Sequence, residues 1–284
     1  MAKLLLGLPV ADALTEELTH KVADLAERGI TPTLAIVRVG ERDDDLSYER
    51  GALKRCVKVG IAVRQFVLPA DCSQDELMAV INEVNTDAAI NGCLMFRPLP
   101  KTLDEAAACA ALDPAKDVDC ITEGSLFGVF ANRPMGFPPC TAQAVIEILD
   151  HYGYELSGAR VSVVGRSLVI GKPVSMMLQA RNATVTMCHT KTVDVDEKTK
   201  AADILVVAAG HIGTVGADAV APGQVVIDVG INWNESLGKL CGDVSFDEVE
   251  PIVAAITPVP RGVGSVTTAI LAEHVVTAAE RKMA

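Results

Sequence analysis

Apolar residues follow two different periods along the first hundred positions. Short runs rich in apolar residues, typical of strands, lie at 33–39, 61–68 and 90–96. Helical spacing of apolar residues predicts helices at 11–28, 46–59 and 74–85. Ser73 and Glu76 have the spacing of a capping box at the start of the third helix. This alternation of strands and helices predicts a parallel sheet.

A second alternating set follows a loop-rich stretch at about 113–141. Its apolar runs predict strands at 159–165, 183–189, 203–210, 225–230 and 254–259. Helices are expected at 172–181, 195–202 and 265–282. The 284 residues suffice for two domains at roughly 150 residues each. The predicted fold class is therefore α/β, with two domains.

A glycine turn joins the first strand of the second set to the helix after it. The turn runs from Gly165 to Gly171, and Pro173 lies in the first turn of the helix. Backbone N–H groups and a helix N-terminus there are suited to a pyrophosphate. The spacing is not that of the usual dinucleotide fingerprint. A tight turn that serves only packing is therefore the alternative.

The end of the next strand bears on the choice of cofactor. NAD sites place an acidic residue about 20 residues after the first glycine, but no acid occurs here before Asp194. Thr190, Lys191 and Arg166 instead offer donors and positive charge to a 2′-phosphate. We therefore expect NADP in preference to NAD. A solvated basic turn without a ligand is the alternative.

Composition and charge narrow the possible functional classes of the protein further. Acidic residues outnumber basic ones by 37 to 25, and aromatic residues make up 4%, so a nucleic-acid surface is not expected. No apolar run reaches the length of a membrane span, and the N-terminus lacks a secretory cleavage pattern. A cytoplasmic protein is the expectation. The eight cysteines and five histidines show no metal-ligand spacing, which predicts free thiols and no metal site.

Six segments in order resemble the FolD family of methylenetetrahydrofolate dehydrogenase/cyclohydrolases. They are Lys116–Asp119 (followed by Cys120 where the family has Gly), Pro139–Thr141, Val164–Pro173, Asp228–Asn232, Gly242–Val244 and Thr257–Gly264. Each segment is a weak signal alone, but their order and spacing hold over nearly the whole chain. The resemblance implies a substrate among the tetrahydrofolate derivatives and a homodimer.

The resemblance also implies a domain division and a set of site residues. Residues 1–141 with 265–284 would form the folate-handling domain, and residues 142–264 would form a Rossmann-type NAD(P)-binding domain. The resemblance implies that the ligands lie in a cleft between the two domains. The implied cofactor residues are Thr141, Gly165, Arg166, Ser167, Gly171, His189, Thr190, Lys191, Ala208, Gly210, Gly230, Ile231, Asn232 and Asp243. The implied substrate residues are Tyr48, Phe96, Pro98, Leu99, Asp119, Pro258 and Gly262.

Two of these residues carry the implied chemistry. By similarity, Asp119 hydrogen-bonds the pterin and Tyr48 packs on the folate aromatic ring. Hydride transfer from the methylene bridge is driven by a folate nitrogen lone pair, so orientation of the rings matters more than acid–base catalysis. Without the resemblance, a loop-capping carboxylate and a half-buried aromatic residue would be equally good interpretations.

The chain departs from the family where hydrolysis of the methenyl product is concerned. Ala52 occupies the position of the family lysine, four residues after Tyr48, and Phe96 occupies that of its partner glutamine. Lys54 lies on a different face of the helix. We therefore expect weak or absent cyclohydrolase activity. The alternatives are a bifunctional enzyme that uses another base and a non-catalytic nucleotide- or folate-binding paralogue.

Two further departures add charge whose role the sequence does not assign. Arg97 precedes Pro98, and Arg261 replaces a glycine of the C-terminal motif, in which Ser265 also replaces a proline. The sequence does not place either arginine relative to the folate or the cofactor.

Overall fold

The structure, a computed structural model, describes residues 1–282. The chain forms two compact units. The large-sheet unit comprises Met1–Ala11 and Thr141–Thr267, and the small-sheet unit comprises Asp12–Cys140 and the C-terminal stretch that begins at Thr268. No helix within the described residues is long and apolar enough to span a membrane.

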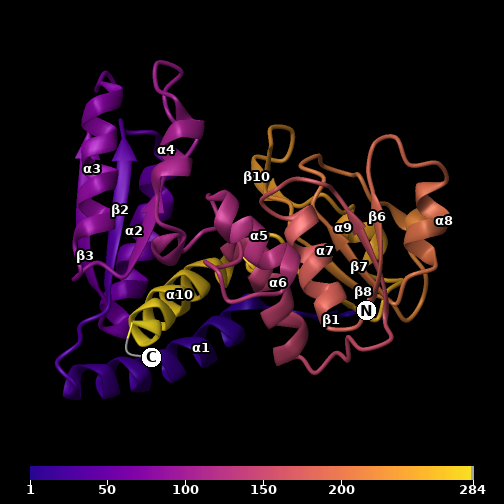
Figure 1. The fold of residues 1–284 in the computed structure, drawn as a ribbon. Coiled ribbons are helices and arrows are strands. Elements are labelled where there is room, and N and C mark those ends of the chain that lie inside the picture. The colour runs from indigo at the N-terminus through magenta and orange to yellow at the C-terminus, as the bar shows by residue number, and fades with distance from the viewer. Residues whose placement is uncertain (283–284) are drawn as a thin grey trace. The chain divides into compact units, whose positions relative to one another are not determined.

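The small-sheet unit is built on three parallel strands in the order β3–β2–β4. These are β3 (Ala62–Leu68), β2 (Thr33–Val39) and β4 (Gly92–Met95). Every residue of β2 is buried, as expected for a central strand with both faces covered. Leu77 and Ile81 pack against β2 from the helix α3 (Gln74–Thr86), which Figure 1 shows beside the strands.

The helices of this unit follow the predicted pattern in part. The expected helices appear as α1 (Gly7–Glu27), α2 (Asp43–Val59), α3 and α10 (Thr267–Arg281). The capping box is confirmed, because Ser73 Oγ accepts a hydrogen bond from Glu76 N (3.2 Å) and the Glu76 carboxylate accepts one from Ser73 N (2.7 Å). The helix α10 lies along α1, from the opposite end of the chain (Figure 1).

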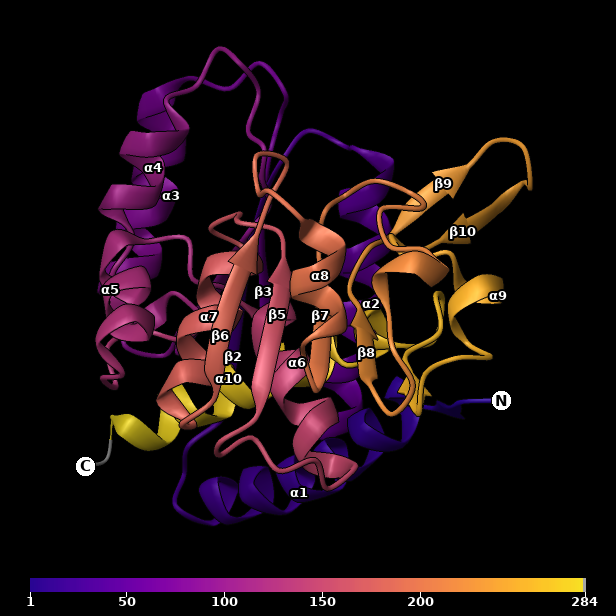
Figure 2. The same cartoon turned by 90° about the vertical axis from the view of Figure 1, so that its right-hand side faces the viewer.

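The large-sheet unit contains six parallel strands in the order β1–β11–β8–β7–β5–β6. They are β1 (Lys3–Leu4), β11 (Ala255–Ile256), β8 (Val225–Asp228), β7 (Ile204–Val207), β5 (Arg160–Val164) and β6 (Thr184–Cys188). Figure 2 shows β6, β5, β7 and β8 side by side in this order. The helices of this unit are α6 (Cys140–His151), α7 (Gly171–Ala180), α8 (Val195–Lys200) and α9 (Phe246–Val249). The sheet order and the buried parallel strands confirm an α/β, Rossmann-type architecture.

Several elements were not expected. The stretch predicted as loop-rich contains α5 (Glu123–Ala131) and the 3-10 turn Pro114–Lys116. The helix α4 (Glu105–Ala111) lies just before this stretch, and α6 begins at its end. Two antiparallel strands, β9 (Asn232–Asn234) and β10 (Lys239–Cys241), form a hairpin after β8. The capping residue Thr122, which accepts a hydrogen bond from Ser125 N, marks the start of α5. Gly124 and Gly128 interrupt the apolar pattern inside α5, and so the periodicity of the sequence does not reveal this helix.

The N-terminus also differs from the expected domain division. The resemblance places residues 1–11 in the folate-handling domain, but β1 pairs in parallel with β11 in the large-sheet unit. Lys3 aligns with Ala255 and Leu4 with Ile256. A two-residue strand has no periodicity of its own, so only its partner far along the chain defines it.

Candidate functional site

The glycine turn after β5 brings two backbone segments into direct contact. Gly165 has a φ of 137°, and a Cβ there would lie 2.3 Å from the carbonyl oxygen of Ala208. A Cβ at Gly171 would lie 2.3 Å from the carbonyl oxygen of Gly165. Side chains at either position would therefore displace backbone. The turn is closed by Ser167, whose Oγ accepts a hydrogen bond from Ile170 N (3.1 Å).

A cavity of about 430 Å³ lies where this turn meets the ends of β6 and β7. Six of the residues implied for the cofactor line it, namely Gly165, Arg166, Ser167, His189, Thr190 and Ala208. Gly165 and Gly171 form a glycine cradle, in which neither position has room for a Cβ. Such a cradle, with a helix N-terminus beside it, fits a dinucleotide. The exposed Lys191 is not part of the lining, although its N–H bonds to His189 Nδ1 (3.1 Å). Asp196, which the sequence argument missed, lines the cavity and brings a negative charge.

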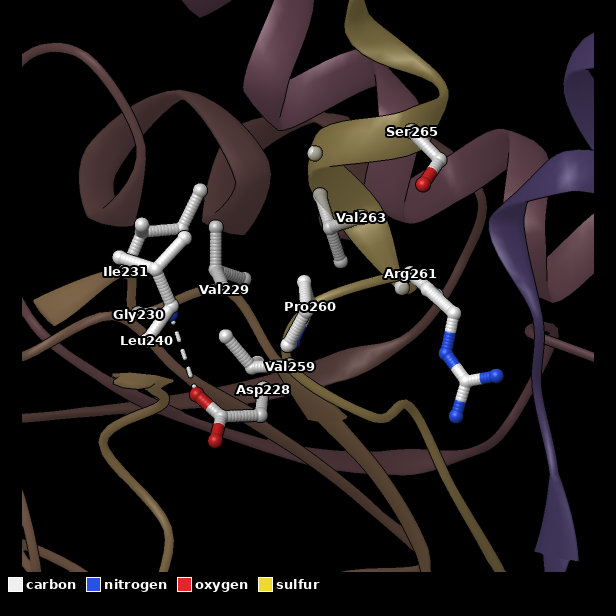
Figure 3. Close-up of a pocket in the computed structure, with 12 residues that line it drawn as sticks. Asp228, Val229, Gly230, Ile231, Leu240, Val259, Pro260, Arg261, Val263 and Ser265 are labelled. Carbon is white, nitrogen blue, oxygen red and sulfur yellow. Dashed lines mark hydrogen bonds between the residues drawn. The ribbon is translucent and has the colours of Figure 1, made fainter. Parts of the chain in front are cut away.

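A second cavity, of about 240 Å³, lies at the end of β8 (Figure 3). Gly230, Ile231 and Gly262 line it, as does Asp228. The Asp228 carboxylate accepts hydrogen bonds from the N–H groups of Gly230, Asp243 and Val244, each at 3.0 Å. Burial raises the pKa of Asp228 to about 6, although these hydrogen bonds act to lower it.

Asp243 connects the loops after β7 and β8. Its carboxylate accepts hydrogen bonds from Ala209 N (2.6 Å), Gly210 N (2.8 Å) and the Asn232 side chain (2.8 Å). Asp243 is fully buried. Its carboxylate therefore positions these loops, and Asn232 and Gly210 are held through it.

In the small-sheet unit, two aromatic side chains implied for the substrate lie together. Tyr48 of α2 and Phe96, which follows β4, have ring centroids 6.1 Å apart at an interplanar angle of 81°. Ala52, one helical turn after Tyr48, is fully buried, whereas Lys54 and Arg50 are exposed. The expected direction of Lys54, away from the Tyr48 face, is consistent with this exposure.

The loop after Phe96 carries Pro98 and Leu99. Its backbone is fixed by Glu105, whose carboxylate accepts a hydrogen bond from Leu99 N (2.7 Å) and lies 3.7 Å from Arg97 Nη1. Arg97 therefore has an acidic neighbour within the small-sheet unit.

Asp119 is half-buried and accepts a hydrogen bond from Cys140 N (3.2 Å). Burial raises the pKa of its carboxyl to about 6, while the Cys140 hydrogen bonds and, more weakly, the charge of Arg97 act in the opposite direction. A carboxyl with this pKa is mostly ionised at neutral pH and can accept hydrogen bonds from pterin N–H groups.

A buried pair that the sequence argument missed supports Asp119. His274 of α10 lies with Nδ1 2.8 Å from the Val118 carbonyl oxygen and 3.8 Å from Cys140 Sγ. Its ring stacks on Phe137, with centroids 4.8 Å apart. Burial lowers the pKa of His274 to about 4 and raises that of Cys140 far above its usual value, so both are neutral. Nothing in the spacing of these residues indicates that they meet.

The other cysteines are free thiols, and most of them are buried. Residues 1–282 contain no group of three or more His, Cys, Asp or Glu side chains arranged to hold a metal ion. Thr141 lies in the first turn of α6, and Pro258 lies in the loop after β11; neither lines the two cavities.

Fold and glycine cradle together define an NAD(P)-binding α/β protein. Two family descriptions match the chain: "Tetrahydrofolate dehydrogenase/cyclohydrolase, catalytic domain" over residues 5–119 and "Tetrahydrofolate dehydrogenase/cyclohydrolase, NAD(P)-binding domain" over residues 139–283. The chain therefore belongs to the tetrahydrofolate dehydrogenase/cyclohydrolase family. The expected enzyme class and the NAD(P)-binding domain are confirmed.

Individual relatives agree with this assignment over the full length. The "Bifunctional protein FolD" of Carboxydothermus hydrogenoformans is 53% identical, covering 99% of this chain and 98% of that protein. The crystal structure of the bifunctional enzyme FolD from Campylobacter jejuni has a TM-score of 0.95 and 36% identity, covering 99% of this chain and all of that one. A Trypanosoma brucei methylenetetrahydrofolate dehydrogenase-cyclohydrolase, solved with NADP and an inhibitor, has a TM-score of 0.92 and 36% identity, covering 99% and 98%.

These names bear on the expected loss of cyclohydrolase activity. Both the family description and the relatives' names include that activity. The comparisons therefore favour the bifunctional alternative over the loss.

Proposed function

We propose that this protein oxidises 5,10-methylenetetrahydrofolate to 5,10-methenyltetrahydrofolate with NADP. The observation that carries the proposal is the cradle at Gly165 and Gly171, where two glycines let backbone approach backbone beside a cavity of about 430 Å³. The Trypanosoma brucei relative solved with NADP supports the same cofactor. The large-sheet unit would bind the nucleotide, and the small-sheet unit the folate.

The cofactor choice rests on charges at the cavity. Arg166 and Thr190 line it and would contact a 2′-phosphate, with Lys191 adding charge from outside the lining. Asp196 lines the same cavity and opposes a phosphate. The preference for NADP therefore depends mainly on Arg166. Bound NADP would supply the hydride acceptor.

The folate side would act by orientation. The Tyr48 ring, braced edge-on by Phe96, would pack on the folate aromatic ring. Asp119 would accept hydrogen bonds from the pterin, and the Cys140 N–H would hold its carboxylate in place. Pro98 and Leu99 would line the same side, and Pro258 and Gly262 would contact the ligands from the large-sheet unit. These groups orient the methylene bridge and move no proton.

The second reaction, hydrolysis of the methenyl product, has two candidate outcomes. Ala52 and Phe96 offer no ionisable or hydrogen-bonding side-chain atom, which argues for weak hydrolysis. The names of relatives up to 53% identical argue for a bifunctional enzyme, and this is the candidate that similarity favours. In that case, a group other than the side chain of residue 52 must supply the base.

A paired assay of the purified protein tests both reactions. One arm follows NADP reduction with methylenetetrahydrofolate, and the other follows loss of added methenyltetrahydrofolate. Absence of NADP or NAD reduction would refute the dehydrogenase. Hydrolysis close to the rate in buffer alone would support the loss, whereas hydrolysis as fast as oxidation would establish the bifunctional enzyme. Titration with folate and nucleotide separates a non-catalytic paralogue, which would bind without turnover.

The resemblance also suggests a cytoplasmic homodimer. Light scattering of the purified protein would give its mass, and fractionation of expressing cells would give its location. A monomer across the working concentration range would contradict the first expectation.

A further inference from the structure

Arg261 adopts a backbone conformation that arginine rarely occupies. Its φ is 83°, in the left-handed region that favours glycine. The conformation is held on both sides, because the Arg261 carbonyl oxygen accepts a hydrogen bond from Gly7 N (2.8 Å) and a Cβ at Gly262 would lie 2.5 Å from the Pro258 carbonyl oxygen. When the surrounding structure holds a residue in a strained backbone conformation, its side chain is a candidate for a functional role.

The Arg261 side chain is exposed and its guanidinium is not neutralised. Within residues 1–282 it forms no hydrogen bond or ion pair with a side chain. It lies at the cavity of about 240 Å³ after β8, and Figure 3 shows it extending away from Val229 and Ile231, on the same side of the loop as Ser265. Asp228, the carboxylate in that lining, is already occupied by three backbone N–H groups. The guanidinium is therefore available to an anion from outside.

The sheet order indicates which ligand carries that anion. The glycine cradle for the pyrophosphate follows β5, whereas the Arg261 cavity follows β8 and β11. Since β7 separates β5 from β8, these sites are about 10 Å apart across the sheet. That separation is about the reach of one ribose and one nicotinamide ring. If the pyrophosphate binds at the glycine cradle, the Arg261 cavity would lie beyond the phosphates, at the end of the cofactor where the substrate binds.

Tetrahydrofolate derivatives carry carboxylates on their glutamate tail. Arginine presents a planar fork of N–H donors that matches a carboxylate, and Ser265 offers a hydroxyl on the same side. We propose that Arg261 is a specificity-determining residue that binds a glutamate-tail carboxylate of the folate substrate. The inference rests on the proposed function. It explains why an arginine is accommodated at a position where glycine would be unstrained.

The test is the substitution Arg261→Gly, which removes the charge and the strain together. We expect the KM for methylenetetrahydrofolate to rise about 3- to 30-fold, the range for one partly exposed charge-assisted contact, with kcat within about twofold. The melting temperature should stay equal or rise, because glycine prefers this φ. Weaker substrate binding in a protein that is not destabilised separates ligand contact from a structural role.

Matched controls locate the anion. With 5,10-methylenetetrahydropteroate, which lacks the glutamate, wild type and Arg261→Gly should have equal KM values. Arg261→Lys should retain part of the affinity for the glutamylated substrate. Asn182→Gly relieves a left-handed φ of 64° elsewhere without removing charge, and it should leave the KM unchanged.

Three results would overturn the inference. The KM could be unchanged with the glutamylated substrate, the loss could persist with the pteroate substrate, or the KM for NADP could rise instead, which would assign Arg261 to a cofactor phosphate. Calorimetric binding of tetrahydrofolate to both proteins tests the contact without turnover. If wild type showed no turnover, the proposed function would fail, while an affinity difference would still decide the role of Arg261.

Discussion

Replacement of Asp119 by asparagine tests the proposed folate site most directly. Asparagine preserves the shape of the side chain and can still accept the hydrogen bond from Cys140 N. It removes the negative charge that would face the pterin donors. One charge-assisted hydrogen bond contributes about 1.5–3 kcal/mol, so Asp119→Asn should lower kcat/KM for methylenetetrahydrofolate by about tenfold to a hundredfold.

The raised pKa of Asp119 predicts a pH profile as well. With a pKa of about 6, the carboxyl is about 97% ionised near pH 7.5 and about 24% ionised near pH 5.5. If the ionised form binds the pterin, wild-type kcat/KM should fall about fourfold over this interval. In Asp119→Asn this fall in kcat/KM at acid pH should disappear. Any fall that remains in the variant reports the pH dependence of the substrate itself.

Stability should move in the opposite direction to activity. A carboxyl whose folded pKa is raised stabilises the fold fully below its unfolded pKa and loses that contribution as pH rises through about 6. Near pH 7.5 the ionised Asp119 therefore opposes folding. Allowing for its partial exposure, Asp119→Asn should leave the free energy of unfolding unchanged or raise it by at most about 1–2 kcal/mol.

Initial rates and denaturant unfolding measure the two effects on the same preparations. Asp71→Asn, which removes an exposed carboxylate of the small-sheet unit, is the matched control and should change neither. Wild-type kinetics in a folded Asp119→Asn, or an equal fall in kcat/KM at acid pH in both proteins, would refute the assigned role.

Three further predictions concern the cofactor, hydrolysis and the buried histidine. Arg166→Ala should raise the KM for NADP about tenfold or more and that for NAD little, since one charge-assisted contact to phosphate is lost; equal wild-type efficiency with both cofactors would contradict it. If the wild type hydrolyses methenyltetrahydrofolate no faster than buffer alone, Ala52→Lys should raise that rate little because Phe96 stays in the partner position, whereas Ala52→Lys with Phe96→Gln should supply part of the roughly 10²–10⁴-fold acid–base contribution. Wild-type hydrolysis as fast as oxidation would instead show that another group is the base. His274, with a pKa lowered to about 4, adds stability above its unfolded pKa and loses it as pH falls. Between about pH 7.5 and 5.0, wild type should therefore lose about 2 kcal/mol of unfolding free energy more than His274→Gln, and equal pH slopes in urea titrations would exclude this.

The sequence alone determined most of the strands and the nucleotide turn. Strands such as β2 and β5 are rich in apolar residues, because both faces of a parallel sheet are covered and each strand carries its own signal. Gly165 and Gly171 stand out because a strand precedes them and a helix follows. The order of motifs along the chain was sufficient to identify the family.

Tertiary structure decided the features that join distant residues. The pairing of Lys3–Leu4 with Ala255–Ile256 has no local signature, because two residues carry no periodicity. The charge of Asp196 enters the cofactor cavity because the start of α8 lies beside the loops that follow β6 and β7. The shifted pKa values of Asp119 and His274 arise from burial. Desolvation is a property of the whole packed environment, and residues more than a hundred positions apart supply it; sequence spacing records only neighbours along the chain.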